Sequence, residues 1–199
     1  GQVACVVVSK RDTPNHFNAA AAQSLVEHGA AHVAGDPATA QLQFVVIGAY
    51  QLEEAFKAHA RLEHHGLASC ITVVVEPGRL RIPRDELEAA FVLGDASLQA
   101  LFPPHLPRVL ISHTRPEPML GVLRRIDSGP SKTRALGYIN RGGTLDVAGM
   151  LIANRCTWAD AIYAAAQVTG WNSSQVAAAA TDARISSGSD AVRGDRAGS

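Results

Sequence analysis

Three short polar segments of this chain of 199 residues carry the side chains best suited to chemistry. Lys10 follows an apolar run at residues 3–8, and His113 follows another apolar run at residues 108–112. A lysine can hold a phosphate as a compact charge, and a histidine can serve acid–base or hydrogen-bonding work. The third segment, residues 141–144, is a polar, glycine-rich turn between a predicted strand and a predicted helix. Ligands and partner domains meet an open α/β sheet at such turns.

Each of these groups also has an interpretation without chemistry. Lys10 and its neighbour Arg11 could simply be solvated side chains of a loop. His113, which has no visible catalytic partner, could pack at a seam between domains. Arg79, Arg81 and Arg84 could bind an anion or pair with Asp85, Glu86 and Glu88, but we favour a solvated, charged loop and helix start.

Several active-site signatures are missing from the sequence. It contains no G-x-G-x-x-G after the first apolar run, no P-loop and no G-x-S-x-G elbow. His59, Glu63 and His64 have helical spacing, but they fall on a charged helix face and are interpreted as surface residues. We therefore predict no metal ligands, no cofactor-binding residues and no complete catalytic set in this chain.

The charge balance and the cysteine spacing limit the kinds of partner and the cellular compartment that we expect for this protein. Lysine plus arginine number 18, as do aspartate plus glutamate, so the charge gives no reason to expect nucleic acid or an anionic membrane as partner. No apolar run reaches the roughly 20 residues that cross a bilayer. Cys5, Cys70 and Cys156 are widely spaced, which argues against a disulfide framework and favours a reduced, cytoplasmic protein.

Apolar runs alternate with helical periodicity along the chain. We predict strands at residues 3–8, 44–47, 70–75, 108–112 and 133–138. We predict helices at residues 19–28, 52–65, 85–102 (one or two helices, with Gly94 and Asp95 between them), 116–123 and 146–168. This order predicts an α/β fold with three layers, helix–sheet–helix, around a five-stranded, mostly parallel sheet. The more polar run at 133–138 is expected at an edge.

The composition changes near the end of the chain. Serine, alanine, glycine, aspartate and arginine dominate from residue 172 onward, with few large apolar side chains. We therefore expect an α/β domain at residues 1–170 and a disordered or loosely helical tail at residues 171–199.

With these residues in view, the chain resembles the C-terminal domain of the phosphoketolases. These are thiamine-diphosphate enzymes that act on xylulose 5-phosphate and fructose 6-phosphate. Three places carry the resemblance, and together they cover roughly residues 3–165. They are Val-Val-Val-Ser-Lys at residues 6–10, Val-Leu-Ile-Ser-His-Thr at residues 109–114, and the stretch from the arginine pair in residues 123–127 through Gly-Tyr at 137–138 to Gly-Thr at 143–144.

The resemblance implies an aldehyde-lyase that splits a ketose phosphate with phosphate into acetyl phosphate and an aldose phosphate. It also implies that preceding domains of the same polypeptide bind thiamine diphosphate and Mg²⁺ across the interface of a homodimer or higher homo-oligomer. This chain alone would then bind neither group and would be inactive. Lys10 is implied near the sugar phosphate or phosphate, whereas His113, Arg141 and Thr144 are assigned to an interface or to the rim of the substrate channel.

The glycine-rich turn departs from the family pattern. Phosphoketolases carry a run of threonines after an acidic loop, but this turn has Thr144 alone and no acidic pair. Two alternatives therefore stay open. One is a related pentulose-phosphate isomerase or epimerase on the same scaffold, and the other is a non-catalytic α/β interaction module.

The coding region upstream of Gly1 tests this interpretation directly. We expect it to encode several hundred further residues, including a Gly-Asp-Gly motif followed by asparagines, because the chain itself has no such motif. Sequencing that region is the measurement. A reading frame that began at this chain would favour a separate partner subunit or a binding module.

Overall fold

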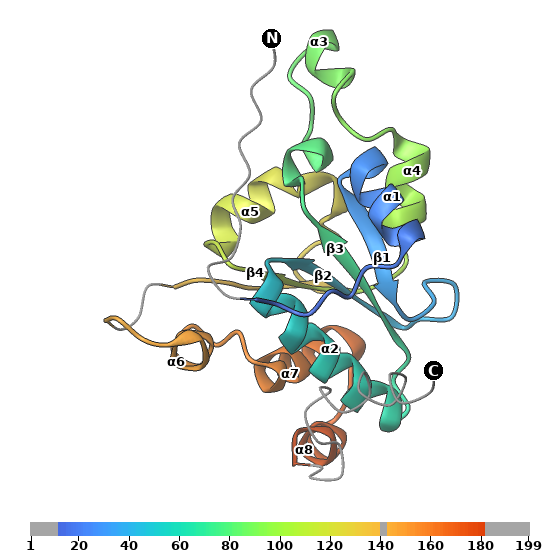
Figure 1. Ribbon diagram of the computed structural model, residues 1–199. Coiled ribbons are helices and arrows are strands. Elements are labelled where there is room, and N and C mark those ends of the chain that lie inside the picture. Colours follow the sequence, from blue (N-terminus) through green and yellow to red (C-terminus); the bar gives the residue numbers. More distant parts are fainter. Residues whose placement is uncertain (1–11, 140–142, 182–199) are drawn as a thin grey trace, which may run out of the picture.

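The computed structural model describes residues 12–139 and 143–181 of the chain. Strands and helices alternate along the described chain, and the strands form one sheet with helices on both faces (Figure 1). The predicted strand at residues 3–8 lies outside the described residues, as does everything after residue 181. No described helix is both long enough and apolar enough to cross a membrane.

Within the described residues, the sheet has five strands in the order β1-β3-β2-β4-β5. Their bounds are β1 (Ala30–Ala34), β2 (Leu42–Ile47), β3 (Ser69–Val74), β4 (Arg108–Ser112) and β5 (Thr133–Leu136). β1 runs antiparallel to β3, and the other neighbours pair in parallel. The prediction of a five-stranded, mostly parallel sheet with the last strand at an edge is therefore confirmed.

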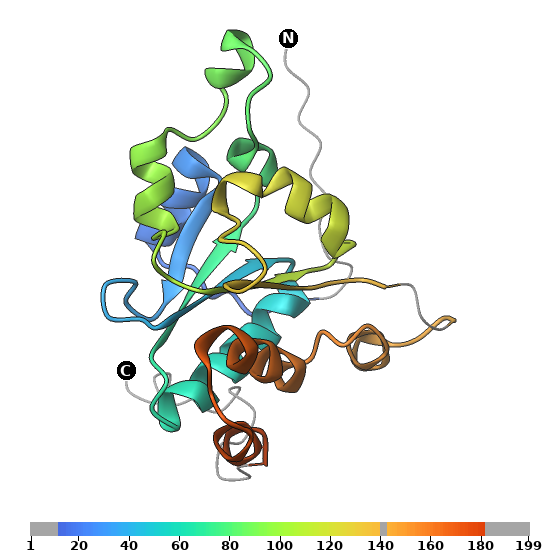
Figure 2. The same cartoon turned by 180° about the vertical axis from the view of Figure 1, so that it is seen from behind.

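The helices divide between the two faces of this sheet (Figures 1 and 2). The longer helices are α1 (Ala19–His28), α2 (Ala49–His64), α7 (Trp158–Thr169) and α8 (Ser173–Thr181). The shorter ones are α3 (Glu86–Ala89), α4 (Asp95–Leu101), α5 (Pro116–Val122) and α6 (Val147–Ala153), with the 3₁₀ helices η1 (Pro77–Leu80) and η2 (Arg124–Ile126). α2, α7 and α8 cover one face, α4 and α5 cover the other, and α3 projects away from the body.

Strand geometry explains how one apolar run supplies two cores. Successive side chains of a strand point to opposite faces, and all six residues of β2 are buried. Phe44 and Val46 therefore pack with α2 and α7, whereas Val45 and Ile47 pack with α4 and η2. A strand covered on both faces has a continuous apolar sequence, as the predictions for β2, β3 and β4 assumed.

Local signals fix several helix ends. Asn18 caps α1 by accepting a hydrogen bond from the backbone N–H of Ala21 at 2.8 Å. Gly29 ends the helix in the left-handed conformation, and its N–H returns to the carbonyl of Leu25. The chain then enters β1 without a loop, a strand that the sequence did not reveal because it begins with two alanines, which have little preference for strands.

The prediction of one helix at residues 146–168 is wrong. The chain breaks between α6 and α7, where Arg155 has a φ of 52°, outside helical geometry. Thr157 and Asp160 form a capping box that starts α7, and buried Glu54 of α2 accepts a hydrogen bond from the first N–H of α7 at 2.7 Å. These hydrogen bonds to the first N–H groups of α7 stabilise a new helix start, although the apolar pattern of the sequence runs on without a break.

The folded part continues beyond residue 170. α8 packs on α7 and α2, and its Val176 and Ala179 are buried in the core on that face. The small residues of this segment suit such packing, because alanines let two helices approach closely. The part of the expected tail after residue 181 lies outside the described residues.

A polar cluster crosses the core at the start of β4. Arg108 is 1% exposed, and its Nε donates to Oε1 of Gln43 at 2.9 Å. The amide of Gln43 in turn donates to Oγ1 of Thr72 at 2.8 Å and to the carbonyl of Leu101 at 2.7 Å. Gln43 therefore joins β2, β3 and β4 to the end of α4, and it satisfies polar groups that have no access to water.

Replacing Gln43 tests how much this cluster contributes. We expect Gln43→Leu to lower the free energy of unfolding by about 2–4 kcal/mol, because a buried guanidinium donor and two acceptors lose their partner. Urea unfolding monitored by circular dichroism measures the change. Gln41→Leu is the matched control, since Gln41 is exposed, and it is expected within about 0.5 kcal/mol of the unmodified chain. Equal losses in the two variants would contradict the assignment.

Candidate functional site

A cavity of about 260 Å³ lies at the carboxyl edge of the sheet, beside the ends of β2, β4 and β5. Parallel α/β sheets bind ligands at this edge, where the loops leave the strands. The lining residues are Tyr50, Gln51, Ser112, His113, Tyr138, Leu145, Asp146, Val147, Met150, Leu151, Asn154 and Cys156. The cavity therefore combines an apolar wall from α6 with polar groups from the strand ends.

The turn from β2 into α2 positions His113. Gly48 has a φ of 118°, which side-chain-bearing residues rarely adopt, and a Cβ there would come within 3.0 Å of Nδ1 of His113. Both the backbone N–H and Nδ1 of His113 contact the carbonyl of Ile47, at 3.0 Å and 3.1 Å. The bare glycine thus lets the imidazole lie directly against the end of the neighbouring strand.

This contact also fixes the tautomer of His113. The carbonyl oxygen of Ile47 can only accept, so Nδ1 carries the proton and donates, which leaves Nε2 as an acceptor in the neutral ring. Within the described residues, no hydrogen bond to Nε2 is formed, and the side chain is exposed. His113 can therefore accept a hydrogen bond from a hydroxyl group at the cavity or pack against another domain.

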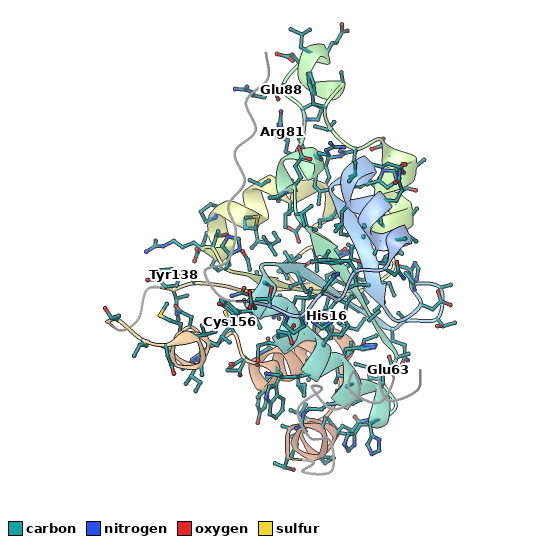
Figure 3. The ribbon with its side chains drawn as sticks, viewed as in Figure 1. His16, Glu63, Arg81, Glu88, Tyr138 and Cys156 are labelled. Atoms are coloured by element: carbon teal, nitrogen blue, oxygen red, sulfur yellow. The ribbon has the colours of Figure 1, made fainter. Side chains whose placement is uncertain are left out.

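The segment after β5 closes onto the end of β4. The N–H of Tyr138 donates to the carbonyl of Thr114 at 2.9 Å. Gly137 permits this approach, because a Cβ at that position would collide with the same carbonyl. The two segments that carry much of the family resemblance, residues 109–114 and the Gly-Tyr pair, are therefore in direct contact (Tyr138 in Figure 3).

Asn154 ties the far wall to this segment. It is 5% exposed, its Oδ1 accepts from the N–H of Ile139 at 2.7 Å, and its Nδ2 donates to the carbonyl of Met150 at 2.9 Å. Asp146 caps the start of α6 by accepting from the N–H of Gly149 at 2.7 Å. Both ends of α6 are thus held by side chains that also line the cavity.

The structure brings some of the predicted site residues to the cavity. His113 lines it, and exposed Thr144 precedes the lining residues of α6. Lys10 and Arg141 lie outside the described residues. The prediction that these four residues bind a sugar phosphate or phosphate therefore stays a prediction.

Sequence reasoning missed several lining residues. Tyr50 and Gln51 lie in the first turn of α2, just past Gly48, and this strand-to-helix position was a signal that the sequence offered. The sequence pointed less clearly to Asp146 and Asn154 as lining residues. The prediction placed Asp146 at the start of one long helix and Asn154 inside it.

The thiols that the structure describes are unsuited to nucleophilic chemistry. Cys156 lines the cavity but is 2% exposed, and burial raises the pKa of its thiol to about 11. Burial likewise raises the pKa of Cys70 to about 12. Both thiols stay protonated at neutral pH and are free of disulfide bonds.

Other candidate groups are occupied by structural pairs. Arg79 pairs with Glu76 at 2.6 Å, and Arg81 and Arg84 both pair with Glu88 (Arg81 and Glu88 in Figure 3). The hydrogen bonds and charge of Arg84 hold the pKa of Glu88 at about 2. The pairs of Arg81 and Arg84 with Glu88 are among those that the sequence allowed, whereas Arg79 pairs with a glutamate that precedes it.

The histidines proposed as surface residues have mixed environments. Nδ1 of His59 contacts Oγ of Ser69 at 2.8 Å, and burial lowers the pKa of this partly buried ring. Among the residues that the structure describes, no group of three or more metal-ligating side chains is assembled.

Gly48 provides a test of how His113 is positioned. We expect Gly48→Ala to lower the free energy of unfolding by at least about 2 kcal/mol and to shift the imidazole resonances of His113, because the added methyl meets that ring. Gly66→Ala is the control: its φ is 86°, but no atom lies within 4 Å of the added methyl. We expect it to cost about 1 kcal/mol from backbone strain alone. Urea unfolding and NMR measure both effects, and an unmoved His113 would contradict this packing.

Solved structures of transketolases share this fold. The transketolase from Leishmania mexicana matches with a TM-score of 0.53 at 19% identity, covering 74% of this chain and 19% of that chain. A transketolase variant from Pichia stipitis in complex with fructose 6-phosphate matches with a TM-score of 0.53 at 14% identity, covering 73% of this chain and 18% of that chain. A Pichia stipitis transketolase structure in complex with xylulose 5-phosphate matches with a TM-score of 0.51 at 15% identity, again covering 73% of this chain and 18% of that chain.

No family model matches the chain, and no curated protein matches it in sequence. At these identities, the likeness to the transketolases is one of fold. The chain spans less than one fifth of the length of those proteins. The structure thus has a transketolase-like domain fold, as expected for a transketolase C-terminal-like α/β domain.

Proposed function

We propose that this chain is the C-terminal domain of a thiamine-diphosphate-dependent, phosphoketolase-like enzyme. That enzyme would cleave xylulose 5-phosphate or fructose 6-phosphate with phosphate, giving acetyl phosphate and an aldose phosphate. One observation carries the proposal. The segments that resemble phosphoketolases, residues 109–114 and 134–138, meet at one cavity on the ligand edge of a transketolase-like sheet, through the Tyr138-to-Thr114 hydrogen bond.

The domain would support the assembly and contribute to the rim of the substrate channel. His113 and Thr144 lie at or beside the cavity, and Lys10 and Arg141 belong to the same proposed rim by resemblance. A lysine ammonium there would hold the phosphate in position for the reaction. No residue of this chain is assigned a bond-breaking step.

The described residues do not fit thiamine diphosphate or Mg²⁺. A metal bound by phosphates needs carboxylate or carbonyl oxygen ligands, yet Asp146 is the one carboxylate among the described lining residues, and it caps α6. We therefore propose that the preceding domains of the same polypeptide hold both groups, within a homodimer or higher homo-oligomer.

Exposed apolar side chains near the cavity favour such a covering domain. Leu145, which lines the cavity, and Ile152 of α6 are 43% and 67% exposed. Exposed apolar side chains beside a cavity are typical of surfaces that another domain covers. If another domain covers this surface, His113 would lie at the seam between the two domains, where its side chain could pack.

Product analysis on the full-length protein tests the reaction. We expect xylulose 5-phosphate, phosphate, thiamine diphosphate and Mg²⁺ to give acetyl phosphate, detected as its hydroxamate. Transfer of the ketol unit to an added aldose phosphate would instead indicate a transketolase, the activity named for the solved structures of similar fold. An interconverted pentulose phosphate would indicate the isomerase or epimerase, and no turnover would favour the interaction module.

Lys10 provides a test of the domain's own contribution. In the full-length protein, we expect Lys10→Ala to raise the KM for phosphate about tenfold, because a charge-assisted contact is lost. Arg11→Ala is the neighbouring control, with a KM expected to be unchanged. Initial rates at varied phosphate concentration measure both. Equal KM values in all three proteins would count against the assigned role of Lys10.

A further inference from the structure

A second cavity, of about 600 Å³, lies at the opposite edge of the sheet, where β4 and β5 begin. α4 and η2 form its sides, and the loop at residues 127–132 forms its rim. The lining residues are Asp95, Leu98, Gln99, Phe102, Pro104, Arg108, Arg125, Ile126, Asp127, Ser128, Ser131 and Lys132. Its volume is within the range of small-molecule sites, which run from about 300 to 1,000 Å³.

The buried guanidinium of Arg108 reaches this cavity from the core. Besides Gln43, its hydrogen-bond acceptors are the carbonyls of Pro103 and Ile126 and the hydroxyl of Ser128. All of these acceptors are neutral, and no carboxylate of the described chain lies within ion-pair distance of Arg108. Its positive charge is therefore not neutralised by a directly contacting group.

Arg125 brings a second cation to the same space. Its Nη2 donates to Oδ1 of Asp95 at 2.7 Å, but the Asp95 side chain is 85% exposed, so water competes for this ion pair. Its Nη1 is buried and has no acceptor within the described residues. A buried donor without a partner is unfavourable, and a small rotation of the side chain would present this edge of the guanidinium to a ligand in the cavity.

The loop at the rim adds hydroxyl and ammonium donors. Oγ of Ser128 accepts from Nη1 of Arg108 at 2.6 Å, so the hydroxyl hydrogen of Ser128 is left to donate. Ser131 and Lys132 are exposed on the same loop. Cationic and neutral donors thus surround one space from three separate elements.

Positive charge exceeds negative charge at this cavity. Three cations line it, Arg108, Arg125 and Lys132, against two carboxylates, Asp95 and Asp127. Both carboxylates already accept hydrogen bonds, Asp95 from Arg125 and Asp127 from the N–H of Gly129 at 2.9 Å. An incoming anion would therefore meet excess positive charge.

We propose that this second cavity binds a phosphate group, from inorganic phosphate or from a small phosphate ester. Arg125 would contact two phosphate oxygens, Lys132 would supply a point charge, and Ser128 would donate to a third oxygen. Several donors converging from different directions suit a tetrahedral phosphate better than a planar carboxylate. The site is separate from the cavity beside His113 and does not depend on the reaction proposed above.

Binding of inorganic phosphate to the chain of residues 1–199, followed by NMR, tests this site. We expect the amide resonances of residues 127–129, 131 and 132 to shift and saturate with phosphate, while sodium chloride at equal ionic strength leaves them in place. Arg125→Gln and Lys132→Gln should each raise the Kd about tenfold, because each removes a charge-assisted contact. Arg124→Gln is the matched control: Arg124 is exposed and does not line the cavity, so its Kd should not change.

Titration with xylulose 5-phosphate in place of phosphate distinguishes the two sources of the group. A lower Kd for the sugar phosphate at the same amides identifies a phosphate ester, and a lower Kd for inorganic phosphate identifies the free ion. The proposal is overturned if chloride reproduces the shifts, if Arg124→Gln weakens binding as much as Arg125→Gln, or if the shifts occur only beside His113. Because no turnover is measured, these outcomes are independent of whether the full-length protein forms acetyl phosphate.

Discussion

The need to satisfy every donor of one buried cation organises much of this fold. Arg108 begins β4, an interior strand of the sheet, with its guanidinium inside the protein, where burial lowers its pKa to about 10. Its hydrogen-bond acceptors come from three places. They are Gln43 of β2, the carbonyl of Pro103 in the connection from α4 to β4, and Ile126 and Ser128 at the end of η2 and in the loop after it. A charge that is still present at neutral pH in such a place requires fixed neighbours, because an unsatisfied donor there would be costly. The amino edge of the sheet is accordingly built around one side chain.

The two edges of the sheet differ in chemistry as a result. The carboxyl edge has a small cavity with an apolar wall, one carboxylate and hydrogen-bonding groups at the strand ends. The amino edge has a larger, polar cavity with an excess of cations. The channel rim proposed for this domain and the proposed phosphate site therefore lie at opposite edges of the sheet. The likeness to the transketolases is one of fold, over less than a fifth of their length.

Most of the architecture followed from the sequence because its signals were local. Asn18 and Gly29 bounded α1, and the continuous apolar runs of β2, β3 and β4 indicated strands covered on both faces. β1 was missed because its alanines have no strand preference, and pairing with β3 supplies the stabilisation instead. The break before α7 was hidden by apolar periodicity, although the pair Thr157 and Asp160 signalled a new helix start.

A site residue could be predicted only where a side chain suited to chemistry stands at a recognisable place in the sequence, such as the end of a strand. His113 could be placed at the ligand edge because it ends a strand, and the structure lines a cavity with it. The partnership of Arg125 with Asp95 could not be foreseen, since the two lie 30 positions apart and meet only through the packing of α4 on η2. Burial of a guanidinium nitrogen likewise depends on tertiary packing, which no local pattern encodes.

The separation of α6 from α7 has an evolutionary consequence. α7 contributes four buried residues to the core, whereas α6 contributes none, although it forms one wall of the cavity. Substitutions along α6 therefore cost little folding free energy, and natural selection can remodel that wall while the scaffold stays stable. A single long helix would have coupled the two requirements. The short break makes the shape of the cavity wall and the stability of the scaffold separately adjustable, through changes in the seven residues of α6.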